Sequence, residues 1–78
     1  MAEADLTEVD LELFRRLVAQ AAAHHDGHLT IYRFTTNWRV GFGTPFERAD
    51  IDAAAEGRTF REAATKALGS EADRLKPR

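Results

Sequence analysis

The sequence predicts a small α+β domain in which helices pack on a two-stranded antiparallel hairpin, in the order helix, strand, strand, short helix, helix. Two observations support this prediction. β-Branched and aromatic residues concentrate in residues 28–44 (HLTIYRFTTNWRVGFGT), with turn residues near the centre of that stretch. Amphipathic segments with helix-capping patterns lie on both sides of it. With 78 residues, the chain is predicted to form a single domain over residues 1–78.

The first predicted helix runs from Leu6 to His25. Asp5 is predicted to cap it, with Glu8 three residues later completing a capping box, and Gly27 is predicted to end it. On a helical wheel of about 100° per residue, one face collects apolar side chains and the other collects charges. The predicted apolar face consists of Leu6, Leu13, Phe14, Leu17, Val18 and Ala21.

Two registers of the hairpin distribute its side chains differently, because a shift of one residue in the loop turns one strand over. The favoured register has a three-residue loop, Thr35-Thr36-Asn37, with Asn37 in the left-handed conformation and Phe34 paired with Trp38. One face then carries Tyr32, Phe34, Trp38, Val40 and Phe42, and the other carries Leu29, Ile31, Arg33, Arg39, Gly41 and Gly43. The alternative has a two-residue loop at Thr36-Asn37. Its apolar face consists of Leu29, Ile31, Trp38, Val40 and Phe42, with Tyr32 and Phe34 left outside.

Either register leaves apolar side chains on both faces of the ribbon. A lone two-stranded ribbon is marginal in water, and its outer edges carry unpaired backbone groups. A chain of this length also has little interior, and it has no cysteine for a stabilising disulfide. We therefore predict a homodimer in which two hairpins join edge to edge into a four-stranded sheet.

The segment after the hairpin contains two capping-box patterns. Residues 44–47 (Thr-Pro-Phe-Glu) predict a short helix or turn that ends by Gly57, with proline at its first helical position. Residues 59–62 (Thr-Phe-Arg-Glu) predict the last helix, which carries an alanine-rich apolar stripe and ends at Gly69. Residues 70–78 are charged and are predicted to form a loose tail. The predicted core of the whole domain is Leu6, Leu13, Phe14, Leu17, Val18, Phe34, Trp38, Val40, Phe42, Ile51, Phe60, Ala64 and Leu68.

The charge and hydropathy of the chain bear on its location and its partners. The formal net charge of -2 provides no overall attraction to nucleic acid or to anionic lipid. No apolar run approaches the roughly 20 residues of a membrane span, and the acidic N-terminus does not resemble a signal peptide. We therefore expect a cytoplasmic protein that does not bind membranes.

Residues 24–28 (His-His-Asp-Gly-His) are the richest cluster of groups that bind metals or transfer protons. Their spacing does not suit a metal, because adjacent helical residues point about 100° apart and no cysteine or further histidine completes the set. The one serine, Ser70, has no histidine nearby in sequence, and Asp50 and Asp52 lie on different sides of a short helix. We therefore expect a non-enzyme with no cofactor and no metal site.

Two function hypotheses follow from the hairpin. The leading one is a non-catalytic protein of unknown role that self-associates and also contacts another protein. The alternative is a nucleic-acid-binding or antitoxin-like regulator. Its candidate site consists of Arg33, Arg39, Tyr32 and Trp38, because arginine contacts phosphates and aromatic rings stack on bases.

Residues 34–44 (FTTNWRVGFGT), together with the helix after them, resemble small uncharacterised αββα-sandwich proteins of alphaproteobacteria and their phages. This resemblance covers most of the chain and implies an αββα fold and a bacterial source, without a known activity. Residues 57–63 (GRTFREA) are similar to the Gly-x-Thr-x-x-Glu-Ala turn into a helix of HicB-type antitoxins. The chain departs from the antitoxin pattern by opening with a long helix and by offering two strands where those proteins have three.

Overall fold

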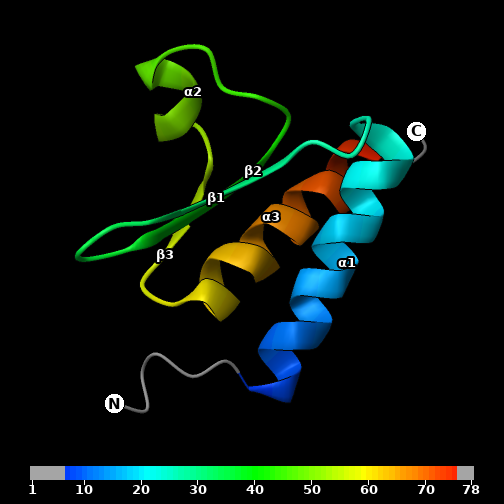
Figure 1. Cartoon of the computed structure of the whole chain (residues 1–78), viewed down its shortest axis with the longest axis horizontal. Coiled ribbons are helices and arrows are strands. Elements are labelled where there is room, and N and C mark those ends of the chain that lie inside the picture. The colour runs from blue at the N-terminus through cyan, green and yellow to red at the C-terminus, as the bar shows by residue number, and fades with distance from the viewer. Residues whose placement is uncertain (1–6, 76–78) are drawn as a thin grey trace.

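The computed structural model describes residues 7–75 of the chain, and it confirms the α+β class. Its elements are α1 (Glu8–His24), β1 (Leu29–Arg33), β2 (Trp38–Phe42), α2 (Arg48–Asp52), β3 (Ala55–Gly57) and α3 (Phe60–Leu75). The strands form one antiparallel sheet in the order β1-β2-β3, so the sheet has a strand more than the predicted hairpin. Helices α1 and α3 lie side by side on one face of the sheet, and α2 lies on the other (Figure 1).

Helix α1 begins at a different cap from the predicted one. The Thr7 hydroxyl accepts a hydrogen bond from the backbone N–H of Asp10, and the Asp10 carboxylate accepts one from the backbone N–H of Thr7. Thr7 and Asp10 therefore form the capping box that was predicted for Asp5 and Glu8. Asp5 itself, like the predicted core residue Leu6, lies outside the described residues.

The buried side of α1 is narrower than the predicted apolar face. It consists of Leu13, Leu17 and Ala21, which recur every four residues and line one side of the helix. Phe14 and Val18 were predicted to lie in the core, but they remain 42% and 46% exposed. The reason is geometric, because a helix at the edge of a two-layer domain contacts its neighbours over only part of its circumference.

The hairpin has neither of the predicted loops. Four residues, 34–37, connect the strands, and the N–H of Phe34 donates to the carbonyl of Asn37. Asn37 is outside the left-handed region, so both the favoured three-residue loop and its left-handed residue were wrong. Strand β1 instead pairs Ile31 with Val40 and Arg33 with Trp38. The helix-facing side is therefore the apolar face of the alternative register, with Phe34 43% exposed instead of buried.

Strand β3 was not predicted, because its sequence has no strand signal. It follows a run of alanines, which favour helices, and it ends at Gly57, which was predicted to stop a helix. Tertiary contacts override this preference, since β3 pairs with β2 and packs under α3. The preceding helix α2 is also capped differently, by Glu47 with Asp50 in place of Thr44 with Glu47.

Helix α3 begins as predicted, with the Thr59 hydroxyl accepting a hydrogen bond from the N–H of Glu62. It does not end at Gly69 but continues to Leu75, so residues 70–75 are helical rather than a loose tail. The buried core consists of Leu13, Leu17, Ala21, Val40, Phe60, Ala63, Ala64 and Ala67. Half-buried side chains packed against it include Leu29, Ile31, Trp38, Phe42 and Leu68. Ile51 was also predicted to lie in the core, but it is half-buried on α2, on the opposite side of the sheet.

Candidate functional site

Within residues 7–75, strand β1 pairs only with β2 and ends the sheet, so its other edge is open. The N–H of Gly43 donates to the carbonyl of His28, and the N–H of Phe34 donates to the carbonyl of Asn37. In an antiparallel ladder such hydrogen-bonded pairs alternate along the strand. The backbone groups of the residues in between, Leu29, Ile31 and Arg33, therefore point to the open edge.

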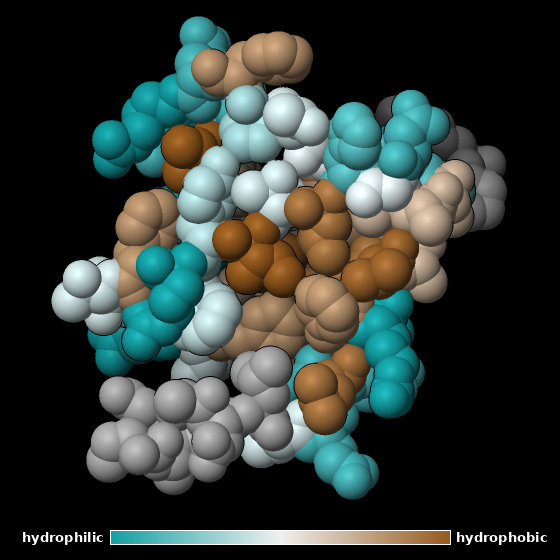
Figure 2. Space-filling view, viewed as in Figure 1, coloured by the Kyte–Doolittle hydropathy of each residue, from teal (hydrophilic) through white to brown (hydrophobic). Residues whose placement is uncertain are grey.

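An exposed apolar strip of α1 lies next to this edge. Leu11, Phe14 and Val18 recur at intervals of three and four residues, and each is more than two-fifths exposed. Across from them, β1 presents the half-buried side chains of Leu29 and Ile31. We call these five residues the β1–α1 face. Figure 2 shows apolar side chains gathered over the region between α1 and β1, on the broad face of the molecule.

Two polar clusters fix the position of α1 against α3. Near the end of α1, Glu71 accepts hydrogen bonds from Gln20 at 2.9 Å, from Arg74 at 3.0 Å and from His25 at 2.8 Å. The Arg74 guanidinium, followed by His25 and Gln20, lowers the pKa of Glu71 from 4.5 to about 2 despite the opposing effect of burial. This carboxylate therefore holds both helices in one arrangement.

The second cluster lies at the start of α1. Arg61 donates to the Thr7 hydroxyl at 3.0 Å and to the Asp10 carboxylate at 3.5 Å. The backbone N–H of Thr7, and secondarily Arg61, lowers the pKa of Asp10. Because α1 is tied to α3 at both ends, the exposed strip of α1 is presented at a fixed angle beside β1.

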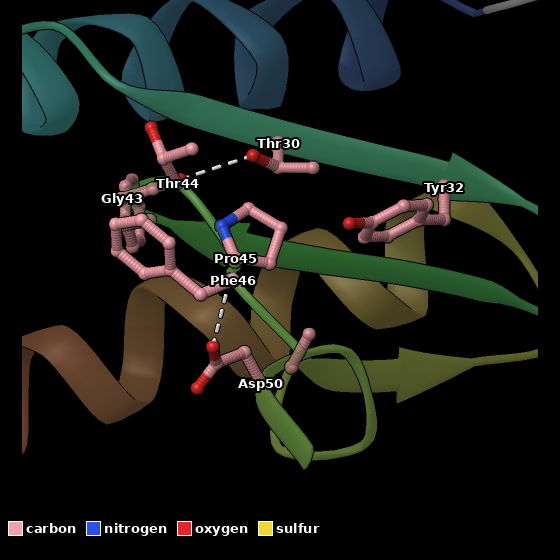
Figure 3. A pocket seen from close by; sticks show the side chains of 10 residues that line it. Thr30, Tyr32, Gly43, Thr44, Pro45, Phe46 and Asp50 are labelled. Carbon is pink, nitrogen blue, oxygen red and sulfur yellow. Dashed lines mark hydrogen bonds between the residues drawn. The ribbon is translucent and has the colours of Figure 1, made fainter. Parts of the chain in front are cut away.

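A pocket opens on the outer face of the sheet, opposite α1 and α3 (Figure 3). The loop of residues 43–46 forms its wall, and the Tyr32 hydroxyl points across it toward Pro45. The Thr30 hydroxyl donates to the Gly43 carbonyl at 3.0 Å, which ties the loop to β1. Gly43 has a φ of 90°, so a glycine suits this turn. The lining residues are Thr30, Tyr32, Gly41, Phe42, Gly43, Thr44, Pro45, Phe46, Asp50 and Ala54.

Arg39 holds the end of α2 against the outer face of the sheet. Its guanidinium donates to the backbone carbonyls of Asp52 at 3.0 Å and of Ile51 and Ala54 at 3.4 Å. It also lies 3.9 Å from the carboxylate of Glu56 on β3. The Arg39 side chain is only 19% exposed, so its charge is used within the fold.

The four residues of the candidate nucleic-acid site do not share one face. Arg33 and Trp38 lie on the helix side, where the Arg33 guanidinium stacks over the Trp38 ring at 5.2 Å. Tyr32 and Arg39 lie on the outer side, and Tyr32 stacks on Phe34. The ladder register separates the pairs, since alternate residues of a strand face opposite ways.

The histidines of residues 24–28 point to different neighbours. His25 hydrogen-bonds to Glu71 and stacks on Phe42 at 4.8 Å, whereas His28 contacts the Thr44 hydroxyl and His24 is exposed. Among residues 7–75, no three histidine, aspartate or glutamate side chains gather closely enough to hold a metal ion.

The exposed strip of α1 was not predicted from the sequence, although the spacing of its residues is visible there. Leu11, Phe14 and Val18 follow a helical period of their own, beside the period of the buried residues. The available signal was that the apolar residues of α1 cover a wider arc of the helix than a single buried stripe requires.

Within residues 7–75, no helix is long and apolar enough to cross a membrane. Comparison with protein-family models, curated proteins and solved structures gives no significant match to this chain. The resemblances to αββα-sandwich proteins and to HicB-type antitoxins therefore stay predictions.

Proposed function

We propose that this protein is a non-catalytic, self-associating protein whose working unit is a homodimer joined through the β1–α1 face. The observation that carries the proposal is an unpaired strand edge directly beside exposed apolar side chains. An open edge is a template for another strand, and a contiguous apolar patch on a small protein marks an interaction site. Together they describe a surface that is complete only when another chain covers it.

A second copy of the chain fits this edge well. A twofold axis through the middle of β1 sets Ile31 against the partner's Ile31 and Leu29 against the partner's Arg33. The backbone groups of Leu29, Ile31 and Arg33 then all pair with the partner strand. If the twofold axis passed through Thr30 or Tyr32 instead, one of these three residues would have no opposite residue in the partner's β1. The product is a six-stranded sheet, in place of the four-stranded sheet that two hairpins would make.

The size of the β1–α1 face is compatible with a stable dimer. A standard interface buries about 800 Å² per partner, or about one seventh of the 5780 Å² surface of this chain. Helix α1 is about 26 Å long and about 10 Å wide, and the edge of β1 adds a strip about 17 Å long, so the two elements provide several hundred Å² of that area. The same axis brings the α1 strips of the two copies together, so that Phe14 and Val18 become buried.

The polar clusters support a non-catalytic role, because each has a structural use. Asp10 and Glu71 join α1 to α3, Asp50 caps α2, and Arg39 binds the carbonyls at the end of α2. A different protein with a free strand edge would fit the same face and would compete with self-association.

The test compares two valines on α1. Val18 belongs to the β1–α1 face, whereas Val9 is 51% exposed and lies nine residues away, on the opposite side of the helix. We expect sedimentation equilibrium to find a wild-type dimer at about 50 µM, a Val18→Glu variant weakened about a hundredfold or more, and an unchanged Val9→Glu variant. Circular dichroism confirms that both variants are folded.

Two outcomes would contradict the proposal. One is a wild-type chain that stays monomeric at this concentration. The other is a Val9→Glu variant that dissociates as readily as Val18→Glu, because a general effect of charge on α1 would then explain both. The nucleic-acid alternative and the cytoplasmic location stay predictions from the sequence.

A further inference from the structure

We infer that the homodimer binds a flat aromatic molecule, uncharged or cationic, in a site on the outer face of the sheet that two chains build together. This inference rests on the proposed function. The pocket of one chain has a volume of about 220 Å³ and opens beside β1. Sites for small organic ligands usually have volumes of about 300–1,000 Å³, which one such pocket does not reach and two joined pockets do.

The ladder register places the other half of the site. Thr30 and Tyr32 line the pocket, and both side chains face outward from β1. When Ile31 pairs with the partner's Ile31, Tyr32 stands opposite the partner's Thr30 on that same outer face. The two pockets then share a floor and merge into one trough. Its walls are the two loops of residues 43–46, which cover β2 of each copy.

The two Tyr32 rings set the shape of the ligand. Diagonal neighbours across an antiparallel pair have Cα atoms about 7–8 Å apart, and Tyr32 and the partner's Tyr32 stand in this relation. The Tyr32 ring also stacks on Phe34, so the floor of the trough carries aromatic surface from both copies. A flat aromatic group can stack against these rings. Each hydroxyl points across the pocket toward Pro45 of its own loop (Figure 3).

The charge at the ends of the trough selects the ligand further. Asp50 lines each pocket, and its Oδ2 accepts hydrogen bonds from the N–H of Phe46 at 2.8 Å and of Glu47 at 3.2 Å. These bonds hold a carboxylate at each end, and the carboxylates repel anions. Phe46, which is 94% exposed, supplies an apolar wall that a bound aromatic group would cover.

The experiment uses two dyes that differ mainly in one sulfonate. N-Phenyl-1-naphthylamine is neutral and carries one N–H donor, and 1-anilinonaphthalene-8-sulfonate is its anionic counterpart. Fluorescence titration of the full chain, with the stoichiometry from equilibrium dialysis, is expected to give one neutral dye per two chains. The anionic dye is expected to bind about tenfold more weakly.

Two substitutions at one position test the site itself. Tyr32→Ala removes the stacking ring and is expected to weaken the neutral dye about tenfold or more, with the dimer intact. Tyr32→Phe keeps the ring and serves as the matched control, with an expected change of about threefold or less. The Val18→Glu monomer is expected to lose the binding that requires two chains.

The failures of the two proposals are distinguishable. A monomeric wild type overturns both. A dimer that binds the neutral dye once per chain, or equally well with Tyr32→Ala, overturns the ligand site and leaves self-association standing. Equal binding by the Val18→Glu monomer also overturns the ligand site.

Discussion

Substitution of Gly57 by alanine tests the packing of β3 under α3. Gly57 is buried at the end of β3 and lacks a left-handed φ, so backbone strain is not at issue. An added Cβ would lie 2.5 Å from the backbone nitrogen of Ala63 and 2.7 Å from the Cβ of Glu62. Ordinary contacts between such atoms are about 3.5–4.0 Å, so the first turn of α3 must move by about 1 Å.

The movement required of the first turn of α3 determines how much stability Gly57→Ala is expected to lose. Overpacking in a tight core costs about 1–3 kcal/mol, and the backbone contacts at Gly57 place this variant at the upper end, near 3 kcal/mol. For a domain of this size each kcal/mol corresponds to about 4–8 °C, so we expect the Tm to fall by about 12–24 °C. Thermal and urea unfolding, followed by circular dichroism at two protein concentrations, separates this effect from any change in self-association.

Gly69→Ala is the matched control. Gly69 lies inside α3, and an added Cβ there meets nothing within 4 Å. Alanine is the better helix former, so we expect a gain of about 0.5–1 kcal/mol. If Gly57→Ala unfolds within about 0.5 kcal/mol of the wild type, the close packing of β3 against α3 is refuted.

Four further substitutions test other parts of the fold. Because the pKa of Glu71 is lowered in the folded state, the ionised carboxylate stabilises the fold fully above about pH 4.5, and this stabilisation is lost as the pH falls toward 2. The free energy of unfolding of Glu71→Gln, measured against pH, is therefore expected to fall less steeply in acid than that of the wild type. Arg39→Ala is expected to cost about 1.5–3 kcal/mol in urea unfolding and to speed hydrogen exchange in residues 48–54, and unchanged exchange there would contradict the role given to Arg39. Leu17→Ala removes a buried side chain and is expected to lower the free energy of unfolding by about 2–5 kcal/mol. Leu11→Ala shortens an exposed side chain and is expected to lower it by under about 1 kcal/mol, at concentrations where the chain is monomeric. Similar losses for both variants would contradict the assigned orientation of α1.

Local signals predicted the helices and two of the strands well. The apolar period of α1, the Thr59 cap of α3 and the aromatic content of β1 and β2 are all encoded in short stretches of sequence. Strand β3 could not be predicted in this way, because residues Ala55–Gly57 form a strand only through pairing with β2 and contact with α3. Tertiary contact, rather than local preference, decides such a segment.

The candidate site was predicted in part. Two apolar faces on the hairpin predicted the need for a partner, which stays untested, and the alternative register gave the correct orientation of β1. The exposure of Phe14 and Val18 could not be predicted, because a helical period does not show which apolar residues a neighbouring element covers. For Arg39 the limit was similar, because its carbonyl partners are distant in sequence and carry no side-chain signature.

The anchoring of α2 by Arg39 has an evolutionary consequence. Its acceptors are main-chain oxygens, which every amino acid possesses, so replacements at Ile51, Asp52 or Ala54 leave those contacts available. The shape of this segment is thus inherited through one arginine on a neighbouring strand. The segment can diversify its chemistry generation after generation while its path through space is preserved.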